Sequence, residues 1–229
     1  MRNVWTSLVL IWWALAAPAQ NVTVIELYTS QGCSSCPPAD ELLHELAKRD
    51  SVIALALHVD YWDYIGWKDE FADPRFTERQ KGYARAAGAR SIYTPQMVIG
   101  GVDHVVGTRP GEVAAHLARH FQKAPLVEID AERSGDRFEL TAQGQGAISG
   151  GVDIFIATYR PASRVEIKRG ENAGRTLTYA NVVTSWTQAR PWNGRGTYEL
   201  AAAVPAGEPA VVLFQRAGHG EIIGAVELR

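Results

Sequence analysis

The segment Val24-Ile-Glu-Leu-Tyr-Thr-Ser-Gln-Gly-Cys-Ser-Ser-Cys-Pro-Pro-Ala-Asp40 contains both cysteines of the chain and predicts three consecutive elements of structure. Apolar residues alternate toward its start, which is typical of a strand. Gly32 and the small residues after it predict a turn, in which glycine permits a close approach of the backbone. Pro37 and Pro38 are tolerated in the first turn of a helix, because N–H groups there have no helical partner. The segment therefore predicts a strand, a C-x-x-C turn and a helix over residues 39–48.

This order places Cys33 and Cys36 at the N-terminus of a helix, where the partial positive charge of free N–H groups favours a thiolate. A C-x-x-C beside alternating strands and helices favours thiol–disulfide chemistry. A disulfide between these positions closes a loop too short to restrict the unfolded chain strongly, so stabilisation of the fold is a weak reason for it. Two other interpretations stay open, an inert disulfide and a pair of metal ligands.

The composition is that of a globular protein. The chain has 229 residues, of which 46% are hydrophobic and 21% are charged. This length allows one large domain or two small ones. The formal net charge of −2 gives no electrostatic reason to expect binding to nucleic acid or to an anionic membrane.

Residues 1–19 have the features of a signal peptide. Arg2 supplies a positive charge, residues 4–16 form an apolar run, and Ala17-Pro-Ala19 offers small residues for cleavage. The run is short for a transmembrane span, and a retained N-terminal anchor stays the alternative. We therefore expect a periplasmic or secreted protein that is not held at the membrane once the signal peptide is removed. In such an oxidising compartment the two cysteines tend to form a disulfide.

Residues 22–124 alternate strand and helix patterns in the order β-α-β-α-β-β-α. Residues 51–59 are almost continuously apolar, which predicts a strand that is buried on both faces and has a parallel neighbour. Asp73 and Pro74 supply an N-cap and a first-turn proline for the second helix. The expected elements are strands at 22–28 and 51–59, helices at 39–48, 73–87 and 108–121, and a hairpin at 91–107.

A segment rich in aromatic residues, 60–71, follows the second strand. In open α/β sheets ligands bind at the carboxyl ends of the strands, so Trp62 and Trp67 are candidates for substrate contacts near the cysteines. The alternative is that these rings pack under their own loop as a small satellite core, because burial of large rings is itself strongly stabilising.

From residue 125 onward the pattern changes to short strands separated by Gly, Asn, Asp and Pro. Strands at such spacing favour an antiparallel sandwich or a partly open barrel. The sequence therefore predicts an α/β domain at 22–124 followed by an all-β, sandwich-like domain at 125–229. The expected strands of the second domain are 127–131, 137–141, 152–159, 175–183, 197–203, 210–215 and 221–228.

The element order resembles the thioredoxin fold, with Cys33-Ser-Ser-Cys36 at the head of the first helix and Thr94-Pro95 at the start of the third strand. More narrowly, the chain resembles the exported DUF1223 family, a thioredoxin-like domain followed by a β-rich one, whose function is not established. The segments that carry this resemblance are Glu26-Leu-Tyr-Thr-Ser-Gln-Gly-Cys-Ser-Ser-Cys-Pro-Pro-Ala-Asp40, His58-Val-Asp-Tyr-Trp-Asp-Tyr-Ile-Gly-Trp67 and Arg169-Gly-Glu-Asn-Ala-Gly-Arg-Thr-Leu-Thr-Tyr179.

The resemblance to thioredoxins implies that Cys33 attacks a substrate disulfide and that Cys36 resolves the mixed disulfide. It also implies that Pro95 is a cis-proline beside the cysteines and that Thr94 presents backbone groups to a bound peptide. The chain departs from the thioredoxin pattern in having Gly32 where a tryptophan usually stands, and Ser-Ser between the cysteines. No Lys, Arg or His lies within the motif, so a thiolate depends on the helix N-terminus and on hydroxyl groups.

Metal binding by the cysteines requires further ligands, for which His58 and His104 are the best candidates. Thiolate and imidazole together suit copper or zinc. Neither histidine has a recognised ligand spacing, and a lone histidine on a strand is more often a hydrogen-bonded structural residue. His116 and His120 share one helix face but lack an accompanying motif, which favours a solvated or packing role.

The segment 169–179 combines charged residues, an amide and two glycines within the β-rich part. A surface turn is the simple interpretation. The alternative hypothesis is that Glu171, Asn172 and Arg175 reach the cysteines and complete a substrate pocket.

Together these features predict an exported thiol–disulfide oxidoreductase that acts on protein or small thiol and disulfide substrates. The expected redox centre is a disulfide between Cys33 and Cys36, with no organic cofactor and no bound metal. The alternative is a module that binds a metal or a protein in the same cleft without turnover.

Overall fold

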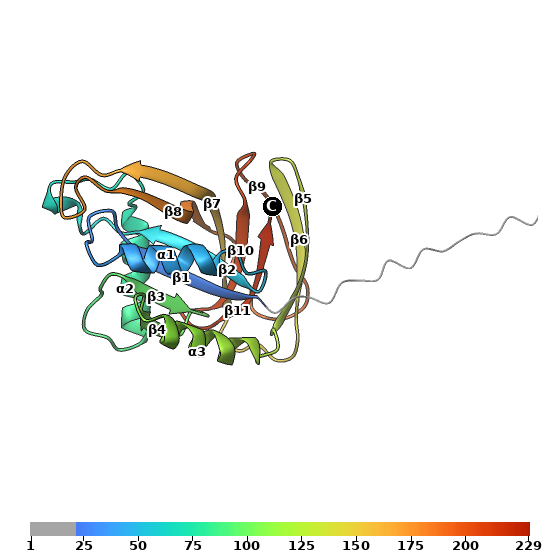
Figure 1. The fold of residues 1–229 in the computed structure, drawn as a ribbon. Coiled ribbons are helices and arrows are strands. Elements are labelled where there is room, and N and C mark those ends of the chain that lie inside the picture. The colour runs from blue at the N-terminus through green and yellow to red at the C-terminus, as the bar shows by residue number, and fades with distance from the viewer. Residues whose placement is uncertain (1–21) are drawn as a thin grey trace, which may run out of the picture.

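The structure, a computed structural model, describes residues 22–229 and contains three α-helices and eleven strands within that range (Figure 1). The expected signal peptide lies outside the described residues. The first half comprises β1 (Thr23–Thr29), α1 (Pro37–Leu46), β2 (Val52–His58), the 3-10 helix η1 (Asp63–Ile65), α2 (Pro74–Ala86), β3 (Gln96–Ile99), β4 (Asp103–Val106) and α3 (Pro110–Phe121). The second half comprises β5 (Val127–Ser134), β6 (Arg137–Gly144), β7 (Val152–Glu166), β8 (Thr176–Gln188), β9 (Tyr198–Ala203), β10 (Ala210–Arg216) and β11 (Ile222–Leu228). No helix in residues 22–229 is long and apolar enough to cross a bilayer.

The strands form one large mixed sheet and one small antiparallel sheet. The large sheet has eight strands in the order β11-β10-β7-β8-β2-β1-β3-β4, and the small one has the order β5-β6-β9. The sequence placed all strands after residue 125 in a separate sandwich-like unit. That expectation is wrong for four of them, because β8 pairs with β2 in parallel at Ala56 and Val182 and so joins both halves in one sheet. The domain boundary near residue 124 stays a prediction.

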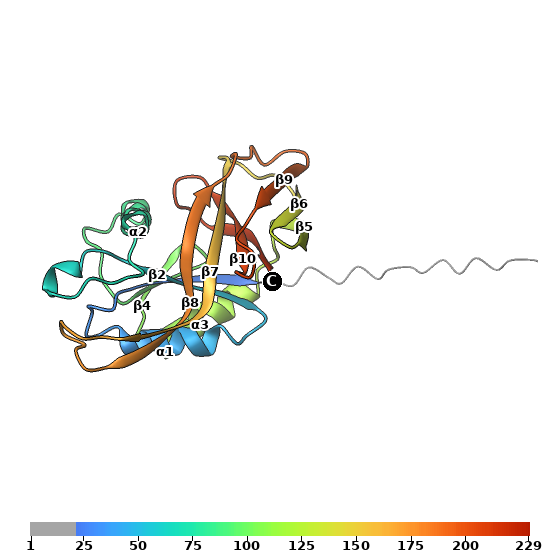
Figure 2. The same cartoon turned by 90° about the horizontal axis from the view of Figure 1, so that it is seen from above.

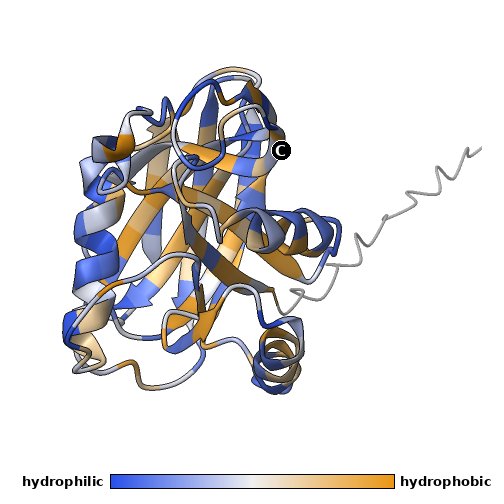
Figure 3. Ribbon diagram, turned by 60° about the vertical axis from the view of Figure 1, so that its left-hand side comes forward, coloured by the Kyte–Doolittle hydropathy of each residue, from blue (hydrophilic) through white to orange (hydrophobic). Residues whose placement is uncertain are grey.

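The helices cover the two faces of the large sheet unequally. Figure 2 shows α1 and α3 on one side of the sheet and α2 on the other. Leu43 of α1 and Leu117 of α3 pack with Ile25 and Leu27 of β1 in one cluster. Phe76 and Tyr83 of α2 pack on the opposite face in a second cluster, with Leu55 and Leu57 of β2. Figure 3 shows extensive hydrophobic colouring along the strands of the large sheet. This explains the uninterrupted apolar run predicted for β2, which is buried throughout and pairs with β1 in parallel.

The alternation along β1 and β2 decides which polar side chains lie under α1. Successive residues of a strand point to opposite faces, so Thr29 shares the face of Ile25 and Leu27, whereas Glu26 points toward α2. Thr29 is directly opposite His58 in the parallel register, and their side chains therefore lie next to each other. Both positions are the last residues of their strands, beside the start of α1.

The small sheet covers the C-terminal strands of the large one. Phe138 and Leu140 of β6 pack with Ile154 of β7 and with Val212 and Phe214 of β10 in a single apolar cluster. The β-rich half therefore does contain two layers packed face to face, as the sandwich interpretation expected, but one of these layers is part of the large sheet.

The turn between β7 and β8, residues 167–175, is called the β7–β8 tip. Figure 1 shows this hairpin reaching the end of the sheet where β1 runs into α1. Ile167 is buried in a cluster with Val165, Tyr179 and Val182, against which Trp67 and Phe71 pack. The long hairpin thus brings residues that are distant in the sequence against the C-x-x-C turn.

Candidate functional site

The cysteines form a disulfide at the N-terminus of α1. Cys33 and Cys36 are joined by an S–S bond of 2.09 Å, and Cys36 is the N-cap residue of the helix. Neither cysteine has exposed surface, whereas Ser34 and Ser35 between them are exposed. The hydroxyl oxygen of Ser35 is 3.4 Å from the sulfur of Cys33. A hydroxyl within the motif is therefore close enough to form a hydrogen bond with this sulfur.

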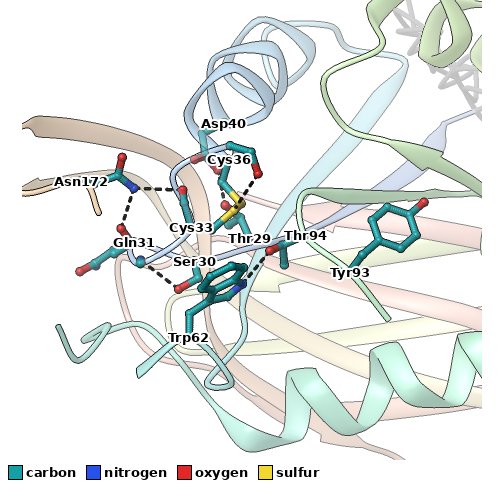
Figure 4. The surroundings of a disulfide bond; sticks show 12 residues. Thr29, Ser30, Gln31, Cys33, Cys36, Asp40, Trp62, Tyr93, Thr94 and Asn172 are labelled. Carbon is teal, nitrogen blue, oxygen red and sulfur yellow. Dashed lines mark hydrogen bonds between the residues drawn. A yellow bond between two sulfur atoms is a disulfide. The ribbon is translucent and has the colours of Figure 1, made fainter. Parts of the chain in front are cut away.

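The aromatic loop that follows β2 forms one wall of the site. The indole N–H of Trp62 donates to the hydroxyl of Thr94 at 2.8 Å (Figure 4). That of Trp67 donates to the side chain of Gln31 at 2.7 Å. A Cβ atom at Gly32 would lie 3.1 Å from the Cβ of Trp62, which explains why a larger residue does not precede the first cysteine. Trp67 also packs in the small cluster under the β7–β8 tip, as the packing interpretation of this loop expected, while substrate contacts of Trp62 and Trp67 stay a prediction.

Thr94 and Pro95 lie near the disulfide, in the segment that leads into β3. The peptide bond between them is cis. Figure 4 shows Thr94 beside Trp62, on the side of the disulfide away from Asn172. The preceding carbonyl, of Tyr93, accepts a hydrogen bond of 2.7 Å from the buried amide of Gln80. Gln80 of α2 therefore fixes the backbone that leads into Thr94, a contact that the sequence did not predict.

The β7–β8 tip closes the opposite side of the site. The amide of Asn172 is buried and donates to the backbone oxygens of Gln31 at 2.9 Å and Cys33 at 3.0 Å (Figure 4). The guanidinium of Arg175 in turn donates to the side-chain oxygen of Asn172 at 2.9 Å. Glu171 is exposed, and its side chain makes no hydrogen bond or ion pair within residues 22–229. The segment is a turn, as the simple interpretation has it, and it also contacts the C-x-x-C turn, while a role in substrate binding stays a prediction.

We expect Asn172→Ala to speed reduction of the disulfide by dithiothreitol several-fold. The substitution removes both hydrogen bonds that hold the tip over Cys33, so the tip opens more often. It also leaves the carbonyl oxygen of Gln31 without the donor it has among residues 22–229, while that of Cys33 keeps the N–H of Cys36, and an unpaired buried carbonyl costs about 1–3 kcal/mol of stability. Lys168→Ala, at an exposed position of the same tip, is the matched control. Equal reduction rates for Asn172→Ala and the unsubstituted protein, measured by thiol titration, would contradict this role of the tip.

Asp40 lies one helical turn after Cys36 and is buried beneath the site. Its Oδ1 accepts a hydrogen bond of 2.8 Å from the hydroxyl of Thr29. Its Oδ2 has no hydrogen-bond partner among residues 22–229. Burial raises the pKa of this carboxyl to about 7, against the opposing effects of His58 and Thr29. From the sequence alone, Asp40 is an acidic residue in the first turn of a predicted helix, where negative charge suits the helix dipole, and its burial is not indicated.

His58 and Asp69 form a buried pair next to Asp40. The Nδ1 of His58 is 2.7 Å from Oδ2 of Asp69, and both side chains are almost wholly buried. Asp69 also accepts hydrogen bonds from the backbone N–H groups of Gln31 and Phe71. Burial alone would raise the pKa of Asp69, but His58 and these N–H groups together lower it. The ring of Tyr179 contacts the imidazole edge-on, with a centroid separation of 4.8 Å.

The histidines considered as metal ligands have other partners. Among residues 22–229 no group of three or more His, Cys, Asp or Glu side chains could hold a metal ion. His104 lies near the amide of Gln96, and burial lowers its pKa. His116 and His120 both contact the carboxylate of Asp103, at 3.1 and 2.8 Å. The i, i+4 pair therefore binds a carboxylate between a helix and a hairpin.

Two features of the sequence could have identified the buried carboxyl. Asp40 is four residues after Cys36, which places both on one helix face if the helix begins at the cysteine. His58 lies near the end of the strand predicted at 51–59, for which a parallel neighbour was expected. The sequence offers no comparable signal for Asp69 or Tyr179, which reach the site from separate segments.

Comparison with known proteins places the chain in a family. A family model described as a protein of unknown function (DUF1223) matches residues 24–215, which confirms the resemblance seen in the sequence. The crystal structure of a protein from Agrobacterium tumefaciens is similar, with a TM-score of 0.76 and 32% sequence identity, and the match covers 93% of this chain and 96% of that one. No curated protein matches significantly. Because the family match spans most of its length, this chain belongs to the DUF1223 family, whose function is unknown.

Proposed function

We propose that the protein is an exported thiol–disulfide oxidoreductase whose first half is a thioredoxin-like domain. The strand order β2-β1-β3-β4 supports the fold assignment, together with α1 and α3 on one face and α2 on the other. The C-x-x-C motif directly before α1 and Pro95 directly before β3 also support this proposal.

The position of the disulfide carries the proposal. Cys33 and Cys36 are separated by only 3 positions in the sequence. Closing so short a loop removes little entropy from the unfolded chain, so the bond contributes little to stability. It lies at a helix N-terminus, close to a buried carboxyl whose pKa is raised to about 7. A group that titrates near neutral pH beside a disulfide is suited to proton transfer during exchange.

The reaction follows from the chemistry of two neighbouring thiols. In the reduced protein the thiolate of Cys33 attacks one sulfur of a substrate disulfide, and the other substrate sulfur leaves as a thiolate. Cys36 then loses its proton and attacks the sulfur of Cys33, which releases the second substrate thiolate and forms the Cys33–Cys36 disulfide. Two electrons pass to the substrate, and the reverse sequence oxidises a substrate dithiol. Ser35, 3.4 Å from the sulfur of Cys33, offers a hydrogen bond to that thiolate.

Substrates reach the sulfurs only after a local movement, because neither cysteine has exposed surface. We assign substrate contacts to the groups that surround the disulfide on both sides. These are Trp62, Trp67 and Thr94 on one side and Glu171, Asn172 and Arg175 of the β7–β8 tip on the other. A protein or small disulfide that displaces the tip would meet the aromatic wall and the backbone of Thr94.

The proposal is tested by trapping the mixed disulfide. We expect reduced Cys36→Ser protein to retain one glutathione after incubation with glutathione disulfide, because the resolving thiol is absent. The matched variant Cys33→Ser should retain far less, and the unsubstituted protein should become oxidised without an adduct. Intact-mass measurement after alkylation distinguishes these products. Equal adducts on both variants, or a reduced protein that stays reduced, would contradict the proposed function.

A further inference from the structure

The β7–β8 tip is basic, although the chain as a whole is slightly acidic. It contains Lys168, Arg169 and Arg175 against the single acidic residue Glu171, so three positive charges and one negative charge give it a net charge of +2. All four side chains are exposed. Within residues 22–229 none of the three basic side chains forms an ion pair. The tip therefore presents positive charge that no carboxylate of this part of the chain neutralises.

Arg175 is the basic residue that lies nearest to the cysteines along a continuous set of hydrogen bonds. Its guanidinium donates to Oδ1 of Asn172 at 2.9 Å. The amide nitrogen of the same asparagine donates to the carbonyl of Cys33 at 3.0 Å. Figure 4 shows this amide pointing at the C-x-x-C turn. A single amide group thus separates the guanidinium from the backbone of the attacking cysteine.

The other end of the tip lies on the aromatic loop. A Cβ atom at Gly170 would be 3.2 Å from the Cβ of Trp67 and 3.5 Å from Cδ1 of Ile65. Arg169 directly precedes this contact in the sequence. Arg169 and Arg175 therefore flank the part of the tip that covers the C-x-x-C turn.

A carboxylate is a better acceptor for Arg175 than the one it has in this structure. Oδ1 of Asn172 is a neutral amide oxygen, whereas a carboxylate forms stronger, charge-assisted and often bidentate hydrogen bonds with a guanidinium. Linked hydrogen bonds also polarise one another, so loss of the Arg175 contact makes Asn172 a weaker donor to Gln31 and Cys33. Capture of a substrate carboxylate by Arg175 therefore loosens the contacts that cover Cys33.

The facing wall of the site repels such a group. The aromatic loop, residues 60–71, contains four acidic residues and Lys68 as its one basic residue. A carboxylate near the disulfide is therefore directed toward the tip and away from the loop. This difference in charge between the two walls orients a substrate that has an anionic end.

We propose that the tip selects small disulfides that carry carboxylate groups, and that Arg175, supported by Arg169, recognises them. The inference rests on the proposed function and names its substrate class. Small molecules fit the site best, because Ser34 and Ser35 are exposed whereas neither cysteine has exposed surface. In the step, the thiolate of Cys33 bonds to one substrate sulfur and the substrate S–S bond breaks. The other half leaves as a thiolate that carries its carboxylate.

The test compares three disulfides of similar size and different charge on the reduced protein. They are dithiodipropionate, with two carboxylates, hydroxyethyl disulfide, which is neutral, and cystamine, with two ammonium groups. Each rate of protein oxidation, followed by acid quench and intact mass, is divided by the rate for dithiothreitol, which removes differences in intrinsic reactivity. We expect the dianion to react about five-fold faster than the neutral disulfide, the effect of one close charge pair in water. High salt should reduce this preference by screening.

Variants of Arg175 separate its charge from its contact with Asn172. Arg175→Gln can still donate to Asn172 but has no charge, so it should lower the rate of the dianion about five-fold and leave the other two rates nearly unchanged. Arg175→Lys should retain most of the preference, and Arg169→Gln should reduce it less than Arg175→Gln does. Arg137→Gln, which removes an exposed charge from β6, is the matched control and should keep the full preference.

The outcomes distinguish the inference from the proposed function. Equal normalised rates for the three disulfides, a preference that salt does not change, or equal slowing of all three by Arg175→Gln would overturn the inference alone. The last result would assign Arg175 only a structural role in holding Asn172. A reduced protein that none of the three disulfides oxidises would overturn the proposed function as well.

Discussion

Replacing Arg79 with leucine is expected to lower the free energy of unfolding by about 3–5 kcal/mol, because it leaves the buried carboxylate of Glu26 without its cationic partner. Arg79 is 5% exposed and Glu26 is 0% exposed. The guanidinium donates to both carboxylate oxygens of Glu26, at 2.7 and 3.2 Å. Without it, the carboxylate of Glu26 keeps only the hydroxyl of Tyr83 as a donor within the part of the chain that the structure describes. A single hydrogen bond from a neutral group does not offset the desolvation of a charge.

The same guanidinium joins α2 to strands of the C-terminal half. It donates to the side chain of Gln215 on β10 at 3.0 Å. It also lies over the rings of Trp186 on β8 and Phe155 on β7, with distances of 4.2 and 4.8 Å to the ring centroids. Each cation–π contact adds about 0.5–2 kcal/mol when it is desolvated. Loss of Arg79 therefore weakens the packing of α2 on both halves of the large sheet.

Urea unfolding and thermal melts measure this effect, and we expect the melting temperature to fall by roughly 10 °C. Lys81→Ala is the control, because Lys81 lies on the same helix and pairs with Glu78 in solvent. Exposed ion pairs contribute little, so this variant should melt with the unsubstituted protein. The combined change of Glu26→Gln and Arg79→Leu should recover part of the loss. A cost below about 1 kcal/mol for Arg79→Leu alone would refute the importance of the pair.

The oxidised protein is expected to lose about 4 kcal/mol of stability between pH 4 and pH 7 through Asp40 alone, a loss that Asp40→Asn abolishes. Burial raises the pKa of Asp40 from 3.8 to about 7 in the folded protein. Between these values the folded chain binds a proton that the unfolded chain has already released. Stability from this group is therefore complete below pH 4 and is lost as the pH rises through 7.

Urea titrations of the oxidised protein at pH 4.5, 6 and 8 measure this difference. Asp40→Asn should become the more stable of the two proteins as the pH rises. Asp69 has the opposite effect on the pH dependence of stability, because its pKa is lowered in the folded protein. Its contribution to the free energy of unfolding is lost only as the pH falls below 4. Asp130→Asn, the same change at an exposed position of β5, serves as the isosteric control. A difference in stability between Asp40→Asn and the unsubstituted protein that is the same at all three pH values would contradict a raised pKa for Asp40.

The local elements of the first half could be predicted because their signals lie within a few residues. Asp73 accepts from the N–H of Arg75 and Pro74 opens α2, as the sequence predicted. The hairpin turns at Gly100 and Gly101, both with positive φ. Helix α1 begins directly after Cys36, because two prolines fit only the first turn. Each of these features depends on the conformational preferences of the residues that form it.

The joining of the two halves could not be predicted in the same way. Strands β7 and β8 run to Glu166 and Gln188, well beyond the strands predicted at 152–159 and 175–183. The apolar pattern of a strand shows that it is buried but does not identify the strand it pairs with. The parallel contact of β8 with β2 brings Asn172 and Tyr179 to the cysteines from the far part of the chain. The site therefore contains residues that no local pattern could assign to it.

The buried carboxyl was missed for a related reason. Asp40 in the first turn of a helix satisfies a familiar electrostatic rule, and exposed acidic residues at that position are common. Its burial depends on contact with Thr29 and on the cover that β8 provides over α1. Asp40 is therefore buried, with a raised pKa, only once the large sheet has assembled around the start of α1.

The central claim is that the Cys33–Cys36 disulfide exchanges with substrates, and its reduction potential tests this most directly. The mature protein is equilibrated in graded dithiol and disulfide buffers, and the oxidised fraction is measured by alkylation and mass. We predict a midpoint between roughly −270 and −120 mV, the range of working thioredoxin-fold oxidoreductases. A midpoint below about −300 mV, which is typical of a resistant structural bridge, would contradict the account.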